Sequence, residues 1–155
     1  MLSQTSEYAI RALLFLAQRP AGEAVPATRI AEALGAPANY LAKTLNALAH
    51  TRLISSARGP AGGFRLRRPA ERITLAEIDD SFGEVRPPAV CLLGDRPCDG
   101  RAPCAAHARW AAVCAQMSAP LQATTLADLL AEDPRCITLD AGALAGLHGP
   151  TAEAA

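Results

Sequence analysis

The feature that most constrains this fold is a pair of short helical patterns joined by only two residues, Gly35 and Ala36. The first pattern begins near Pro26, and the second begins at Pro37 and runs to about His50. Proline suits the first turn of a helix because the N–H that it lacks would have no partner there, and glycine suits the residue that follows a helix. Two helices joined by so tight a turn predict a helix-turn-helix, although many other helical domains contain such a pair.

A glycine-rich hairpin pattern follows the two helices. The segment 53–58 has strand character, the segment 64–67 alternates apolar and basic residues, and the turn between them is rich in glycine. A hairpin needs no positive charge for its own pairing, whereas DNA phosphates attract it. Four arginines surround this hairpin: Arg58, Arg65, Arg67 and Arg68. A helix-turn-helix followed directly by such a hairpin predicts a winged helix.

The formal net charge of zero hides a split between the two halves of the chain. Residues 1–70 hold nine Lys/Arg and three Asp/Glu, a net +6, whereas residues 71–155 hold six Lys/Arg and twelve Asp/Glu, a net −6. This asymmetry favours a polyanionic partner for the first half alone. Two solvated surfaces would carry the same charges, so charge by itself leaves both interpretations open.

Two more helices are expected beside the winged helix. One runs from Ser6 to about Gln18, because its apolar residues recur at helical spacing and form one stripe. The other opens with a capping box, in which Thr74 and Glu77 bond reciprocally to the start of the helix. We therefore expect residues 1–82 to form a winged helix-turn-helix DNA-binding domain.

A long helix is expected from Ala105 to about Ala119, where Pro120 interrupts it. Its apolar stripe is too large for one small domain to cover, so we expect the helix to cross its mate in a homodimer. The stripe consists of Trp110, Val113, Cys114 and Met117. The predicted fold is mainly α with a small β-hairpin wing. Beyond the winged helix lie a cysteine loop (83–104), a dimerisation helix with a short C-terminal helix (105–135) and a flexible tail (136–155).

Five cysteines occur in the chain, and three of them form a cysteine triplet in the Pro/Gly-rich loop: Cys91, Cys98 and Cys104. No apolar run approaches the roughly 18 residues of a membrane span, and no signal-peptide pattern is present. In the cytoplasmic protein that we therefore expect, such cysteines indicate metal or redox chemistry, although the triplet could form a disulfide on oxidation. Thiolates bind iron–sulfur clusters, and the triplet is spaced more widely than the knuckle of a structural zinc site.

Three stretches of the chain share a likeness with one known family. They are residues 6–13 (SEYAIRAL), the wing 55–64 (SSARGPAGGF) and the Cys91-x6-Cys98-x5-Cys104 spacing. Together they resemble the Rrf-type bacterial repressors, and in particular the IscR/NsrR-like iron–sulfur sensors, over about residues 1–135. The resemblance implies a dimeric repressor that binds a palindromic operator in double-stranded DNA. It also implies that an iron–sulfur cluster senses redox, iron or nitric oxide status.

The resemblance makes the cysteine triplet the cluster ligands and leaves a fourth position open. His107 matches the histidine ligand of IscR-like members, which implies a 2Fe–2S cluster in preference to 4Fe–4S. The rival is Glu7, which matches the position from which NsrR-like members supply a carboxylate from the partner subunit. Asp95, Asp99 or another thiol remains as a further alternative. We expect Cys114 to pack in the core and Cys136 to stay uninvolved.

DNA contacts are expected from the recognition helix (residues 37–50) and from the wing. A recognition helix enters the major groove with its N-terminal end first, where Asn39 suits adenine and Lys43 suits guanine or phosphate. Arg58 is expected to insert into a narrow minor groove. The full set of candidate contacts is Thr28, Ala38, Asn39, Tyr40, Lys43, Ser55, Ser56, Arg58 and Gly59.

Other function classes fit the sequence less well. It has no nucleophile–base motif, no phosphate-binding loop and no cofactor fingerprint, so we do not expect an enzyme. The main alternative is a cluster-free or zinc-bound winged-helix regulator that responds to thiol oxidation or to a small molecule.

Overall fold

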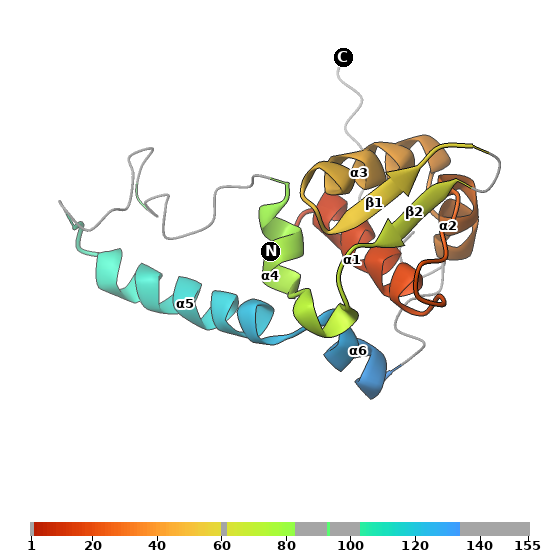
Figure 1. Ribbon diagram of the computed structural model, residues 1–155. Helices are drawn as coiled ribbons and strands as arrows, with labels where there is room; N and C mark the ends of the chain where they lie inside the picture. Colours follow the sequence, from red (N-terminus) through yellow and green to blue (C-terminus); the bar gives the residue numbers. More distant parts are fainter. Residues whose placement is uncertain (1, 60–61, 83–92, 94–102, 134–155) are drawn as a thin grey trace, which may run out of the picture.

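The computed structural model describes residues 2–59, 62–82, 93 and 103–133 (Figure 1). Within these residues the fold is mainly helical, with one two-stranded antiparallel sheet. This architecture confirms the predicted fold class. The elements in chain order are α1 (Gln4–Ala17), α2 (Ala27–Leu34), α3 (Ala38–His50), β1 (Ile54–Ala57), β2 (Gly63–Leu66), η1 (Ala70–Arg72), α4 (Leu75–Asp80), α5 (His107–Ala123) and α6 (Leu126–Glu132).

The helix-turn-helix consists of α2 and α3, and its turn has the expected chemistry. Gly35 follows α2 in the left-handed conformation, with φ 61°, and its N–H bonds to carbonyls of the last turn of α2. Glycine adopts this conformation without the steric cost that a Cβ would add. Pro37 then sits at the N-cap of α3. The predicted bounds of both helices agree with the structure to within one residue.

The wing is tied to the start of the helix-turn-helix. Strands β1 and β2 pair in register, with Ser55 opposite Arg65 and Ser56 opposite Phe64. Val25, just before α2, exchanges two backbone hydrogen bonds with Phe64, at 2.9 and 2.8 Å. Gly63 adopts φ 152°, and a Cβ there would collide with the backbone of Val25. The wing therefore approaches α2 closely only because residue 63 has no side chain.

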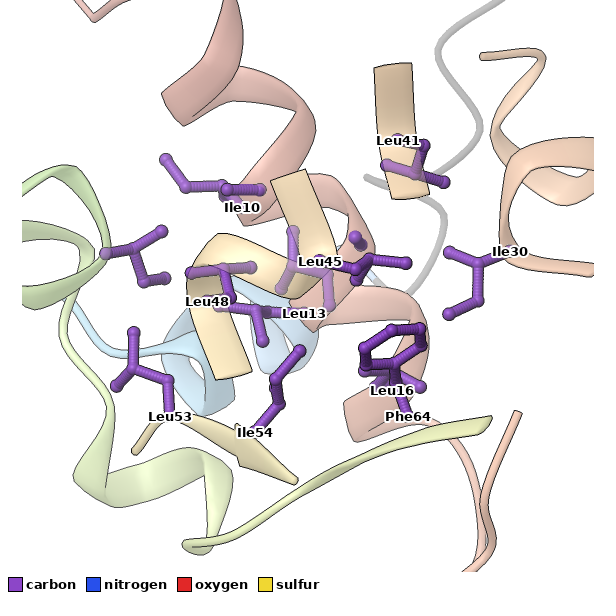
Figure 2. Packing of buried hydrophobic residues seen from close by; sticks show 14 of the residues in the cluster. Ile10, Leu13, Leu16, Ile30, Leu41, Leu45, Leu48, Leu53, Ile54 and Phe64 are labelled. Atoms are coloured by element: carbon purple, nitrogen blue, oxygen red, sulfur yellow. The ribbon is translucent and has the colours of Figure 1, made fainter. Parts of the chain in front are cut away.

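A single hydrophobic core joins α1, the helix-turn-helix and the wing, as Figure 2 shows. Helix α1 packs against several neighbouring elements, and the leucines of α3 are buried in the same core. Burial of each large aliphatic side chain stabilises the fold by about 1.5–3 kcal/mol. The labelled members of the core are Ile10, Leu13, Leu16, Ile30, Leu41, Leu45, Leu48, Leu53, Ile54 and Phe64.

Helix α6 packs on the winged helix, although the sequence analysis grouped it with the long helix. Leu126 is fully buried in the core. Its N–H bonds to the carbonyl of Ile73 at 3.0 Å, and the N–H of Leu75 bonds to the carbonyl of Thr124 at 3.0 Å. This long-range backbone pairing returns the chain to the first domain, and local sequence patterns carry no sign of it.

Helix α5 contacts α4 at one end and extends away from the winged helix at the other (Figure 1). It continues through Pro120 to Ala123, so the prediction that Pro120 ends the helix was wrong. A proline removes one helical hydrogen bond, and the bond from the N–H of Thr124 to the carbonyl of Pro120, at 2.9 Å, closes the final turn. Cys114 is buried at 2% exposure, as predicted. None of the helices within the described ranges is long and apolar enough to cross a membrane.

Candidate DNA-binding surface and metal-ligand residues

Helix α3 presents one apolar and one polar face. Its leucines are buried, whereas Ala38, Asn39 and Lys43 are exposed in the first two turns. Thr28 is exposed in the first turn of α2. These four candidate contacts therefore have side chains available at the N-terminal ends of both helices, which is where helix-turn-helix proteins meet DNA.

Tyr40 has a different environment from the other candidates on α3. Its hydroxyl shares a hydrogen bond of 2.6 Å with Oγ1 of Thr5. Its ring meets the ring of Tyr8 edge to face, with 5.5 Å between centroids. The side chain is half-buried and joins α3 to α1, so its hydroxyl is already engaged inside the domain.

The outer part of the wing is exposed up to the edge of the described residues. Ser56, Arg58 and Gly59 are exposed, and Gly59 adopts φ 105°. Ser55 is half-buried, and its Oγ accepts a hydrogen bond of 3.3 Å from Nε of Arg65. Arg58 is thus exposed at the outer end of the wing.

The four arginines near the hairpin are not equivalent. Arg65 also donates from Nη1 to the carbonyl of Gly22 at 3.2 Å. Arg68 forms an ion pair with Glu77, with 3.0 Å between Nη2 and Oε1. Arg58 and Arg67 are exposed. The count of four arginines predicted phosphate contacts for all of them, because a count of charges cannot show which arginines meet a partner within the chain.

The predicted cluster ligands divide between described and undescribed residues. His107 is the first residue of α5, and its N–H bonds to the carbonyl of Cys104 at 3.0 Å, so the two lie in one turn and both are half-buried. Glu7 is half-buried in α1. No group of three or more possible metal ligands forms among the residues that the structure describes. The remaining candidates, Cys91, Cys98, Asp95 and Asp99, lie outside them.

Sequence reasoning gave no role to Arg11, although it lies within one of the three motifs. Arg11 is 4% exposed in the middle of α1, and its Nη2 donates to the carbonyl of Leu34 at 3.1 Å. The available signal was an arginine between the apolar residues of a predicted buried helix. Charged side chains are rarely buried without a specific partner.

Comparison with known proteins supports one family. The sequence model of the Rrf2 family, described as iron-dependent transcriptional regulators, matches residues 2–132. The HTH-type transcriptional regulator IscR of Xenorhabdus nematophila is 32% identical over 129 residues, which cover 83% of this chain and 78% of that protein.

Solved structures give the same result. The structure of T. potens IscR has a TM-score of 0.68 and 25% identity, and the match covers 94% of this chain and 96% of that one. Staphylococcus aureus CymR, which has also been solved in an oxidized form, has a TM-score of 0.63 and 27% identity over 82% of this chain and 95% of its own. The chain thus belongs to the Rrf2 family of winged-helix, DNA-binding transcriptional regulators, whose members are not enzymes.

Proposed function

We propose that the chain is a cytoplasmic, homodimeric repressor that binds a palindromic operator and senses redox, iron or nitric oxide status through a 2Fe–2S cluster. The observation that carries this proposal is the position of Cys104 and His107. Two residues with metal-ligating side chains lie in one turn, at the start of the long helix α5. A ligand site at that point acts directly on α5.

The DNA contacts follow from the exposed ends of the helix-turn-helix and from the wing. Asn39 and Lys43 on α3 would read base edges in the major groove, with Ala38 beside them. Thr28 and Ser56 have hydroxyls that suit phosphate oxygens. Arg58, at the open edge of the wing, would enter the minor groove.

The proposed dimer is held together by α5. Val113 is 46% exposed and Met117 is 49% exposed, which leaves apolar surface without cover in the described chain. A hollow of about 340 Å³ lies beside this face, and Trp110 and Arg109 help to line it. A second α5 would cover the apolar face and would place the two recognition helices about 34 Å apart, one turn of DNA.

The donor set fits an iron–sulfur cluster. The cysteine triplet would supply three thiolates, and His107, which lies within one turn of Cys104, would supply the fourth ligand. Glu7 of the partner subunit is the rival for that fourth position. A bound cluster would supply a redox-active iron centre that is easier to lose or modify than one with four cysteines. Cys104 and His107 would then pass a change in ligation into α5 and into the geometry of the dimer.

Anaerobic purification tests this proposal. The wild-type protein should absorb visible light and contain iron and acid-labile sulfide, and Cys104→Ala should lose both. Cys136→Ser, which removes a cysteine outside the triplet, should retain them and is the matched control. Colourless wild-type protein that carries stoichiometric zinc after anaerobic cluster reconstitution would contradict the proposal.

A second candidate is a cluster-free regulator that responds to thiol oxidation. It is favoured by the structural similarity to S. aureus CymR, whose oxidized form has also been solved, and by the half-buried Cys104. This candidate predicts colourless protein whose DNA binding changes with peroxide and recovers with a thiol reductant. Iron and sulfide in the purified protein would exclude it.

A further inference from the structure

Helix α1 buries a charge that has few partners. Arg11 is 4% exposed, and one hydrogen bond, from Nη2 to the carbonyl of Leu34, holds its guanidinium. Its Nε and Nη1 have no hydrogen-bond partner among the described residues. Burial of a charge with so little compensation opposes folding, and an apolar side chain of similar size often stabilises such a site equally well. Stability alone therefore does not account for an arginine at this position.

The acceptor of Arg11 belongs to the turn between α2 and α3. Leu34 is the last residue of α2, and Gly35 follows it in the left-handed conformation. The final carbonyls of a helix carry partial negative charge, to which a guanidinium is attracted. Arg11 thus fixes the end of α2 to the middle of α1.

Two other residues of α1 contact the helix that follows the turn between α2 and α3. Tyr40 lies in the first turn of α3 and contacts both Thr5, through the 2.6 Å hydrogen bond, and Tyr8, through the edge-to-face rings. The Arg11 guanidinium carbon lies 5.9 Å from the centroid of the Tyr8 ring, within reach of a cation–π contact. Thr5, Tyr8 and Arg11 are spaced by three residues along α1, and we call them the α1 bracket.

We propose that the α1 bracket sets the orientation of the recognition helix, with Arg11 and Thr5 as positioning residues that do not touch DNA. Base readout requires Asn39 and Lys43 to meet base edges in register, whereas phosphate contacts tolerate small rotations. Loss of the bracket should therefore reduce selectivity more than general DNA affinity. The inference rests on the proposed docking of α3 in the major groove.

The test uses the full-length protein and a duplex that the wild type selects from a random pool. Dissociation constants for this duplex and for an unselected duplex are compared at one salt concentration, with thermal unfolding of each variant. Arg11→Met should weaken binding to the selected duplex by about tenfold, the size of one good contact, and leave the unselected duplex within about twofold. Its melting temperature should equal or exceed that of the wild type, and Arg11→Lys should recover part of the selectivity.

Two further variants make the result decisive. Arg19→Met removes the same charge from an exposed position two residues after the end of α1 and should match the wild type. Thr5→Val removes only the hydroxyl that bonds Tyr40 and should also reduce selectivity, which keeps the test valid if Arg11→Met fails to fold. Unchanged selectivity in the folded variants, or equal losses of affinity for both duplexes, overturns the inference but leaves the proposed docking of α3 intact. A wild type that enriches no sequence overturns the docking and the inference together.

Discussion

At the scale of single residues, neighbours decide what each positive charge can do. Arg58 and Arg68 both flank the wing, yet Arg68 pairs with Glu77, whose other carboxylate oxygen caps α4 through the N–H of Thr74. An ion pair this exposed contributes about 0–1 kcal/mol to stability, but it occupies the guanidinium. Arg58 is exposed on the side of the wing that leads to the turn.

This difference gives the first prediction. Arg58→Ala should weaken operator binding by at least about 1 kcal/mol, because it would remove the direct DNA contact proposed for this residue. Arg68→Ala, which removes the same charge from the same hairpin, should change affinity much less. Gel-shift titrations of both variants at one salt concentration check this, and equal affinities for Arg58→Ala and the wild type would reject the minor-groove role.

A second prediction concerns the backbone of the wing. Gly63→Ala should lower stability by about 1–3 kcal/mol or more, because its φ is unfavourable for an L-residue and its Cβ would meet the backbone of Val25. Gly22→Ala is the matched control, since Gly22 also has a positive φ but has nothing within 4 Å of the added Cβ. Thermal unfolding compares the two, and an equal loss in both would contradict the close approach as the cause.

At the scale of elements, the signals that worked were local. The prolines, Gly35 and the Thr74 capping box lie at the ends of the helices that they predict, so the sequence alone located the helix-turn-helix and α4. The packing of α6 depended on distant partners. Helix α6 pairs with residues about fifty positions earlier in the chain, and the continuation of α5 past Pro120 has no local marker.

A pH prediction follows from the cap of α6. Hydrogen bonds from the side chain and the backbone N–H of Thr125 lower the pKa of Asp128 below its ordinary value. A carboxyl whose pKa is lower in the folded state contributes stability above its unfolded pKa, and this contribution disappears as the pH falls through the folded pKa. Asp128→Asn should therefore destabilise the protein near neutral pH and much less in acid. Thermal unfolding of the wild type and of Asp128→Asn, measured from neutral to acid pH, checks this prediction. A difference in stability that does not change with pH would contradict it.

At the scale of the whole molecule, the sequence predicted the winged-helix fold better than it predicted the site. The positive half folds into the winged helix, and the exposed apolar face of α5 agrees with the expectation that one domain cannot cover it. Spacing alone could not assign the fourth ligand of the proposed cluster, because His107 and Glu7 lie on different helices and Glu7 would come from a partner subunit. The contact of Tyr40 with Thr5 could not be predicted either, because it joins residues 35 positions apart.

The proposed dimer gives a prediction at this scale. Val113→Glu should convert the protein to monomers and abolish cooperative binding to a palindrome, because it places two like charges in an apolar interface. Ala115→Glu adds the same charge at an exposed position about half a turn away on α5 and should remain dimeric. Sedimentation velocity distinguishes the two, and a dimeric Val113→Glu variant would reject α5 as the interface.

Operator affinity measured anaerobically on one preparation, before and after removal of its cluster, tests the central claim most directly. The visible spectrum of each sample establishes its cluster content, and the duplex is one that the wild type selects. We predict that the two forms differ in affinity by at least about fivefold, the low end of typical coupling between two sites. Equal affinities of the two forms for every selected duplex would contradict a cluster-sensing regulator.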